Sequence, residues 1–341
     1  MFTLQYLNPV RVKASVRQGG VAVCRRDQRR VRLVPAIHAQ LLRNLKYAIP
    51  DEKFKQFATR SGGEFIGFEA YFDATTGEPL EVPERFVPQE YRDWHVRVFG
   101  LDENYSEAID GATLFGKRQL IDVKVGCQED AVSAEAKHIT IDLSRTDMHA
   151  VFPCGCFSAR LSATSAHDEK VLFSLIFRDL KELRRIQIEF TAFPLESKHP
   201  FGREIVVRRE MYDQPFNGGV QLIGCGGKVE SFVTFERRLG SPRGLRRRIC
   251  SLDDHVSMET IRDLAGDTRQ EFREVHFLSL PANISVRRYA TRDASTLVYE
   301  AAAMISDLST GPGPALALAR NYDASTGQYK GSELFIEFFE N

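Results

Sequence analysis

Two charged residues near the end of the chain have the chemistry of a ligand-binding pair. In the stretch 314–322, alternation with a period of two places Arg320 on one face with two leucines and Tyr322. In the preceding stretch, 296–305, it places Glu300 among Val, Ala and Met. If these faces point inward, a guanidinium and a carboxylate stand on neighbouring strands in an apolar interior. A buried carboxylate is costly unless it is paired, and Arg is its natural bidentate partner.

This pair has two interpretations. In the functional one, Arg320 holds a ligand carboxylate, while Glu300 or Asp323 binds polar nitrogens of the same ligand. In the structural one, the pair is an internal ion pair, or the arginine packs over aromatic rings at the end of a barrel. Asp323 also opens the turn-like sequence 323–327, where Asp is a natural turn former. The sequence leaves both interpretations open.

The segment 91–95, Tyr-Arg-Asp-Trp-His, is the richest cluster of functional side chains in the first half of the chain and contains its only Trp. Alternation over 93–101 predicts a strand with Trp94 in the core. Arg92 shares the face of Trp94, so it is the charged residue on an apolar face. It is a candidate anion anchor, or else it marks the solvated beginning of the strand.

The sequence shows no readable arrangement of nucleophile, base and acid. The eight histidines are scattered and form no metalloprotease or similar motif. Cys154 and Cys156 are the one close cysteine pair, and positions i and i+2 of a strand share a face. No second Cys or His pair at zinc spacing accompanies them, so two small buried residues are the favoured interpretation. We predict neither catalytic residues nor a metal site, although an enzyme with ordinary acid–base groups stays open.

Short β-compatible runs dominate the pattern that positions these residues. We expect a helix at 36–48 and then strands at 64–73, 93–101, 119–125, 171–177, 186–192, 204–209, 271–280, 283–289, 296–305, 314–322 and 332–339. The last five have short turns between them, which indicates an up-and-down meander. Such a meander protects its edges best by closing into a barrel.

Charge is unevenly distributed, although the formal net charge is zero. Residues 1–35 contain eight basic residues and one acidic residue. An acid-poor, Arg-rich beginning with Ser and Thr resembles an organelle transit peptide, and Phe2 after Met1 resembles the leader of plastid proteins. The alternatives are an N-terminal strand pair or a nucleic-acid-binding arm, but no RNA- or DNA-binding motif follows. No run approaches roughly 18 apolar residues, so we expect no transmembrane helix.

Several motifs resemble one known family. The C-terminal motifs are Leu280–Arg287, Tyr299–Ala302, Ala319–Ser325 and Ser332–Phe335, and the upstream motifs are Val87–Val96 with Val125–Cys127 and Tyr212–Gly219 with Gly224–Gly227. Their order and spacing resemble the lipocalin-like family that contains the S-type phycobiliprotein lyases and their uncharacterised two-lobed relatives in cyanobacteria, algae and plants. The upstream motifs resemble the plastid branch of those relatives.

The resemblance implies an all-β fold of calycin, lipocalin-like antiparallel barrels in two lobes, with a short N-terminal helix. It implies a transit peptide or basic arm at 1–35, a first lobe at 36–200 and a second barrel at 201–341. The lyases of the family bind open-chain tetrapyrroles and transfer them to phycobiliprotein cysteines. This sequence lacks the His- and Trp-rich signature of the active lyases, which argues against lyase activity.

From these observations we expect a non-catalytic protein of the plastid stroma that binds a small hydrophobic ligand, with a bilin or other tetrapyrrole as the candidate. The candidate ligand-binding residues are Arg320, Glu300, Tyr322, Asp323, Arg92 and Trp94. The alternatives are a bilin lyase whose partner is a phycobiliprotein subunit, and a scaffold or assembly factor for another plastid protein. Nucleic acid is not an expected partner.

Overall fold

The computed structural model describes residues 52–123, 133–163, 169–179, 182–193, 199–219, 246–249, 256–257, 273–291, 293–305 and 314–338. The chain divides into two compact units, Met1–Leu45 and Lys46–Asn341, and all the described residues belong to the second. The basic segment 1–35, the expected helix at 36–48 and the motif Gly224–Gly227 lie outside the described residues. The transit peptide and the plastid location therefore stay predictions.

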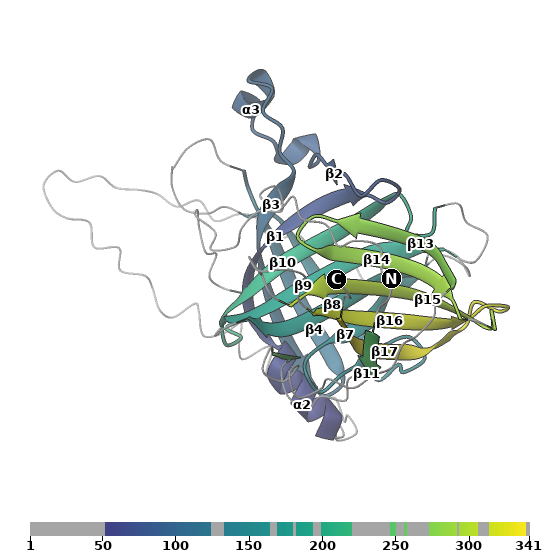
Figure 1. Ribbon diagram of the computed structural model, residues 1–341. Helices are drawn as coiled ribbons and strands as arrows, with labels where there is room; N and C mark the ends of the chain where they lie inside the picture. The colour runs from purple at the N-terminus through teal and green to yellow at the C-terminus, as the bar shows by residue number, and fades with distance from the viewer. Residues whose placement is uncertain are drawn as a thin grey trace, which may run out of the picture. The chain divides into compact units, whose positions relative to one another are not determined.

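The larger of two β-sheets, sheet A, has eleven strands. Its main path runs in the order β5-β4-β3-β1-β10-β9-β8-β7-β6, with β2 paired to β1 and β12 paired in parallel to β8. The bounds are β1 Gly63–Asp73, β2 Pro79–Leu80, β3 Gly100–Asp110, β4 Thr113–Ile121, β5 Ser133–Asp142, β6 Ala150–Val151, β7 Phe157–Ala163, β8 Glu169–Asp179, β9 Glu182–Ala192, β10 Glu204–Gln214 and β12 Val256–Ser257. The sheet curls into a half-barrel (Figure 1).

Sheet B is a smaller, antiparallel sheet of six strands in the order β11-β17-β16-β15-β14-β13. The bounds are β11 Arg246–Ile249, β13 Arg273–Leu280, β14 Ile284–Ala290, β15 Thr296–Met304, β16 Ala315–Asp323 and β17 Tyr329–Phe338. From β13 to β17 each strand pairs with the next one in the sequence, along the green-to-yellow strands of Figure 1. The five predicted closing strands and their up-and-down order are confirmed.

Short helices accompany the sheets. Helix α2, Glu52–Ser61, comes directly before β1 and buries Phe57 and Ser61. The 3-10 helix η1, Glu84–Phe86, and helix α3, Gln89–Asp93, lie in the link between β2 and β3. The all-β, two-lobed fold with a short helix ahead of the strands is thus confirmed.

Two strand predictions differ from the structure. Residues 94–99 belong to no strand, and β3 begins only at Gly100, so the strand predicted at 93–101 is wrong. The strand predicted at 119–125 is β4 and lies earlier in the chain. The expected division between residues 200 and 201 falls between β9 and β10, which pair with each other in sheet A.

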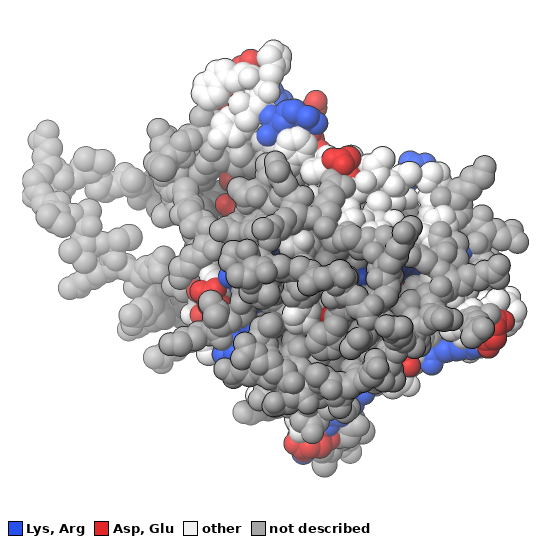
Figure 2. Space-filling view, viewed as in Figure 1, with Lys and Arg blue, Asp and Glu red and all other residues white. Residues whose placement is uncertain are grey.

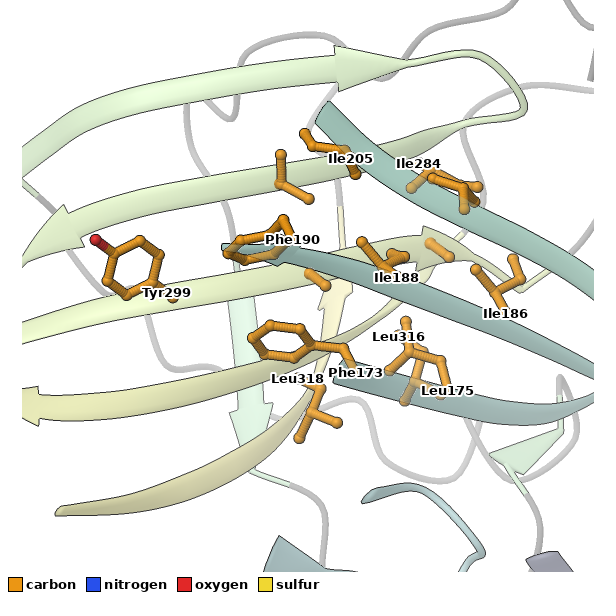
Figure 3. Close-up of a cluster of buried hydrophobic side chains, with 14 of the residues drawn as sticks. Phe173, Leu175, Ile186, Ile188, Phe190, Ile205, Ile284, Tyr299, Leu316 and Leu318 are labelled. Atoms are coloured by element: carbon orange, nitrogen blue, oxygen red, sulfur yellow. The ribbon is translucent and has the colours of Figure 1, made fainter. Parts of the chain in front are cut away.

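An apolar core joins the two sheets. The hairpin predicted in the middle of the chain is confirmed, because Phe173 of β8 pairs with Ile188 of β9 and both belong to this core. The rings of Phe173 and Phe190 are stacked, with 5.5 Å between centroids. Figure 3 shows Leu316 and Leu318 of sheet B beside these side chains of sheet A. Removing such residues from water is the main favourable contribution to folding.

Nearly identical turn sequences close a hairpin in each sheet. Asp73-Ala-Thr-Thr-Gly77 begins at the last residue of β1, and Asp323-Ala-Ser-Thr-Gly327 begins at the last residue of β16. Each Asp carboxylate accepts the N–H groups two and three residues later, at distances of 2.7 to 3.0 Å. Gly77 and Gly327 have φ values of 73° and 70°, which Gly adopts at little cost. The turn role of Asp323 is confirmed, and both lobes use the same local device.

Replacing Phe190 tests this core. Phe190→Ala removes a side chain that is 1% exposed and packs against the rings of Phe173, Phe201 and Tyr299. We expect the free energy of unfolding, measured in urea, to fall by about 3–5 kcal/mol. The control Phe216→Ala changes a Phe that is 47% exposed, and the free energy should change by less than about 0.5 kcal/mol. Equal losses in the two variants would contradict the assigned core.

Candidate functional site

The face of sheet A that points away from the apolar core carries a cluster of buried polar and charged side chains, called here the inner-face network. Side chains alternate along a strand, so β1 places Phe72 in the core and Glu69 on the opposite face. The strand registers align the equivalent positions of β3, β4, β9 and β10. The network consists of Glu69, Glu103, Tyr105, Glu107, Arg118, Arg185, Gln187, Glu189, Arg208 and Glu210.

Arg118 of β4 joins strands from both sides of the curled sheet. Its Nη1 donates to Glu103 Oε2 on the neighbouring β3, and to Glu210 Oε1 on β10 at 3.4 Å. Its Nη2 donates to Gln187 Oε1 on β9 at 2.6 Å. Three strands separate β4 from β9 in the sheet order. The contact between them therefore requires the curl.

Arg185 of β9 makes a second contact between strands that are not neighbours. Its Nε donates to Glu210 Oε2, and its Nη1 donates to Glu107 Oε2 on β3 at 3.3 Å. The Tyr105 and Ser61 hydroxyls also donate to the Glu107 carboxylate, at 3.0 and 2.5 Å. The Tyr105 ring centroid lies 4.5 and 4.6 Å from the guanidinium carbons of the two arginines. These are cation–π distances, so the ring links both cations.

A third arginine, Arg208 of β10, pairs with two carboxylates. Its Nε donates to Glu69 at 2.6 Å and its Nη1 to Glu189 at 2.8 Å. Burial acts to raise the pKa of both carboxyl groups, but the nearby cations outweigh it. The pKa of Glu189, which also contacts Lys170, falls to about 2, and the pKa of Glu69 lies below its ordinary value. Both groups are therefore ionised at neutral pH.

The pKa of Glu103 shifts in the opposite direction. Burial raises its pKa from the ordinary 4.5 to about 8. Arg118 acts to lower this pKa, but the carboxylates of Glu210 and Glu69 act to raise it further. Burial also raises the pKa of Glu107. At neutral pH Glu103 therefore carries a proton.

Four buried polar atoms of the inner-face network have no hydrogen-bond partner among the described residues, and neither has the hydroxyl of Ser174, which lies opposite Gln187 on the same face. The four atoms of the network are Glu103 Oε1, Arg118 Nε, Arg185 Nη2 and Gln187 Nε2. An unsatisfied buried group costs about 1–3 kcal/mol, and the large majority of buried polar groups in proteins are paired. These four belong to side chains that Arg118 and Glu210 already link, so the cost is concentrated in one place. This place is the candidate binding site.

Apolar clusters lie at both ends of the inner-face network. At one end, Phe57 of α2 packs on the apolar residues that continue the inner face. At the other, Val82 and Phe86 from the link between β2 and β3 pack on Leu120. Leu120 is the cross-strand partner of Glu103, so this cluster borders the candidate site. A ligand held at the network would meet apolar side chains there.

The structure separates Arg320 from Glu300, which the sequence analysis placed together. In the pairing of β15 with β16, Arg320 stands opposite Tyr299, and Glu300 stands opposite Ala319. Directly opposed residues of antiparallel strands share a face, so the two charges lie on opposite faces of sheet B. The prediction failed because both faces of β15 are apolar. Its alternation does not indicate which face packs on sheet A.

Arg320 uses all three guanidinium nitrogens within the protein. Its Nε donates to Tyr322 Oη at 2.8 Å, its Nη1 to Ser158 Oγ at 3.2 Å and its Nη2 to the Met148 carbonyl at 3.1 Å. The guanidinium also lies 4.3 Å from the ring centroid of Tyr329. Ser158 belongs to β7, so its hydrogen bond with Arg320 connects sheet B to sheet A. This arrangement matches the structural interpretation of the residue.

Glu300 and Tyr322 also have protein partners. Glu300 accepts a hydrogen bond from Tyr289 Oη at 3.0 Å and forms an ion pair with Arg287 at 2.8 Å. Tyr322 Oη donates to Glu169 at 3.0 Å while it accepts from Arg320. These contacts stabilise sheet B and its junction with sheet A.

The segment around Trp94 is an exposed helix end, so its predicted place in the core is wrong. Trp94 is 61% exposed, and the surface at α3 is white beside charged atoms in Figure 2. The N–H of Val96 bonds to the carbonyl of Tyr91 and that of His95 to the carbonyl of Arg92, with φ of 53° at His95. This Schellman ending reverses the chain before the alternating residues can form a strand. Arg92 is exposed and outside the inner-face network.

The sequence analysis selected no residue of the inner-face network. A signal is present in β9, because Arg185, Gln187 and Glu189 alternate with apolar residues there, whereas in β10 the charged Arg209 stands between Arg208 and Glu210. Such alternation is typical of a strand with one face in water. Only the curl of the sheet buries these residues, and no single strand encodes that curl.

Other chemistry is limited in the part of the chain that the structure describes. Cys154 and Cys156 form no disulfide and lie buried in the apolar core, which agrees with the favoured interpretation of two small buried residues. No group of three or more His, Cys, Asp or Glu among the described residues is placed to hold a metal ion. No described helix combines the length and the apolar character needed to cross a membrane.

Comparisons with known proteins show a likeness to solved structures alone. No protein-family model matches the sequence, and no curated protein matches it. Among solved structures, the chain is similar to a protein of unknown function from the DUF3598 family of Nostoc punctiforme PCC 73102. The identity is 13% and the TM-score 0.42, with 84% of this chain and 98% of that chain covered. A likeness at this level assigns no function.

Glu103 gives the stability of the protein a pH dependence of defined sign. Between the ordinary value of 4.5 and the folded-state pKa of about 8, the folded chain holds a proton that the unfolded chain has released. Stability therefore falls as the pH rises through this range. We expect the free energy of unfolding to be lower at about pH 8.5 than at about pH 6.5. Glu103→Gln, which cannot titrate, should reduce this difference.

Glu189, a buried carboxylate whose pKa is lowered and not raised, provides the control. The pKa of Glu189 is about 2, so this group is ionised in both the folded and the unfolded chain between these two pH values. Glu189→Gln should therefore lower the stability equally at both pH values. Urea unfolding of the three proteins at the two pH values measures these differences. If Glu103→Gln keeps the full wild-type difference, the proton is not on Glu103.

Proposed function

We propose that this chain is a non-catalytic binding protein that takes a small ligand at the inner-face network of sheet A. The four unpartnered, buried polar atoms of the network carry this proposal. A ligand that satisfies them forms hydrogen bonds in a site of low dielectric constant, where such bonds are strong. A few convergent polar groups among apolar side chains are typical of small-molecule sites.

An amphipathic, conjugated molecule suits this site best. The rings of Tyr105 and Phe65 lie against the arginines of the network, and apolar clusters lie at both of its ends. Open-chain tetrapyrroles combine conjugated apolar rings with carbonyl and N–H groups. The sequence resemblance to a family whose lyases bind such tetrapyrroles makes a bilin the first ligand to test. The proposal keeps the expected ligand class and moves its site away from Arg320 and Glu300.

Biliverdin is the probe for this proposal. Its titration into the purified full-length chain is expected to shift the visible absorption of the bilin and to reach saturation. Gln187→Met removes the donor at Nε2 without adding a charge to the network, and it also removes the oxygen that accepts from Arg118. We expect this variant to bind at least about tenfold more weakly, because one buried hydrogen bond to the ligand is lost.

The matched control makes the same change on the other face of sheet A. Gln119 follows Arg118 in β4, so its side chain points away from the inner-face network. Gln119→Met should leave the dissociation constant unchanged, and thermal unfolding checks that both variants fold. Absence of any spectral shift with the wild type rejects the bilin as ligand. Equal dissociation constants for the two variants reject the network as its site.

A further inference from the structure

Charge in the inner-face network is closely balanced. Its five carboxyl groups face four cations, of which three are the arginines of the network and the fourth is Lys170, paired with Glu189. With Glu103 protonated and the other four carboxyl groups ionised, the charges of these described residues cancel. A bound anion or cation would leave one uncompensated charge in a buried site, which is strongly unfavourable.

Hydrogen bonding places the proton of Glu103 on a particular oxygen. Glu103 Oε2 accepts from Arg118 Nη1, so the hydrogen belongs on Oε1, which is one of the four unpartnered atoms. The other three, on Arg118, Arg185 and Gln187, are N–H donors. The four unpartnered atoms of the network are therefore all donors at neutral pH.

Charged groups from three strands face Glu103 and set its protonation. Arg118 comes from β4, Glu69 from β1, and Arg208 and Glu210 from β10. The two carboxylates oppose ionisation of Glu103, and the two guanidinium groups favour it. Ionisation would convert the donor at Oε1 into an acceptor and leave the network with a net negative charge.

We infer that this site recognises a neutral acceptor oxygen, such as the carbonyl of an amide, a lactam or an ester, and excludes carboxylates. The inference rests on the proposed function and names the ligand group at that same site. A carbonyl oxygen offers two lone pairs to the donors and adds no charge. A carboxylate would accept the same hydrogen bonds, but its charge would be uncompensated. Any carboxylate of the ligand therefore lies outside the inner-face network.

Biliverdin and its dimethyl ester test this inference, because they share lactam carbonyls and differ in the charge of their propionate groups. At neutral pH we expect the wild type to bind the two with dissociation constants within about threefold of each other. The affinity for the ester should fall at least about tenfold between about pH 6.5 and about pH 9, as Glu103 ionises. Absorption titrations measure both effects.

Two variants assign the pH dependence. Glu103→Gln cannot ionise, so the ratio of its affinities for the ester at about pH 6.5 and about pH 9 should stay near one, whatever its affinity at neutral pH. Glu135→Gln makes the same change at a half-buried position of β5 outside the network, and it should keep both the wild-type affinity and the wild-type pH dependence.

Each remaining outcome contradicts a specific claim. If the free acid binds at least about tenfold more tightly than the ester, the site recognises a carboxylate, and this inference fails while the proposed function stands. If Glu103→Gln keeps the wild-type pH dependence, Glu103 is not the group that selects the ligand. If neither compound binds to the wild type, the proposed function fails, and the inference fails with it.

Discussion

The rest of sheet A depends on hydrogen bonds and ion pairs between strands that are not neighbours. Arg118 of β4 binds Gln187 of β9, and Arg185 of β9 binds Glu107 of β3, so these bonds form only in a curled sheet. A buried ion left without its partner is strongly destabilising. A slip of one residue in any of these strands would turn its charged side chains into the apolar core. The curl and the registers of the strands are therefore fixed together.

The two faces of sheet A consequently have separate roles. The outer face packs against sheet B through an apolar core, which Arg320 supplements with hydrogen bonds to the Ser158 hydroxyl and the Met148 carbonyl. The inner face holds polar groups in a site bordered by apolar clusters. Sheet B thus acts as a support that keeps the curled sheet in place, while the candidate binding chemistry belongs to sheet A. Of the six residues predicted from the sequence, four lie in β15 and β16 of sheet B, and Arg92 and Trp94 lie in the first lobe.

The sequence predicted those features that depend on neighbours along the chain. The strands of sheet B, the β8–β9 hairpin and the turn at Asp323 follow from period-two alternation and from turn residues. Features that depend on pairing between distant strands could not be predicted from the sequence. The faces of Arg320 and Glu300 depend on which side of β15 packs on sheet A, and the burial of Arg185 depends on the curl. At Trp94 a Schellman turn at His95 overrode a strand pattern of only a few residues.

Energetics favour a ligand over a purely structural role for the inner-face network. A buried ion network adds little net stability compared with well-packed apolar residues, and the outer face of the same sheet is packed in that apolar way. Glu103 weakens the fold further, because its ionised form is disfavoured wherever the pH exceeds its ordinary pKa. Four unpartnered atoms add to this cost. Arg320 shows the contrast, since all its nitrogens have protein partners and none is left for a ligand. Unfavourable groups kept together in one place are understandable where a bound molecule offsets them.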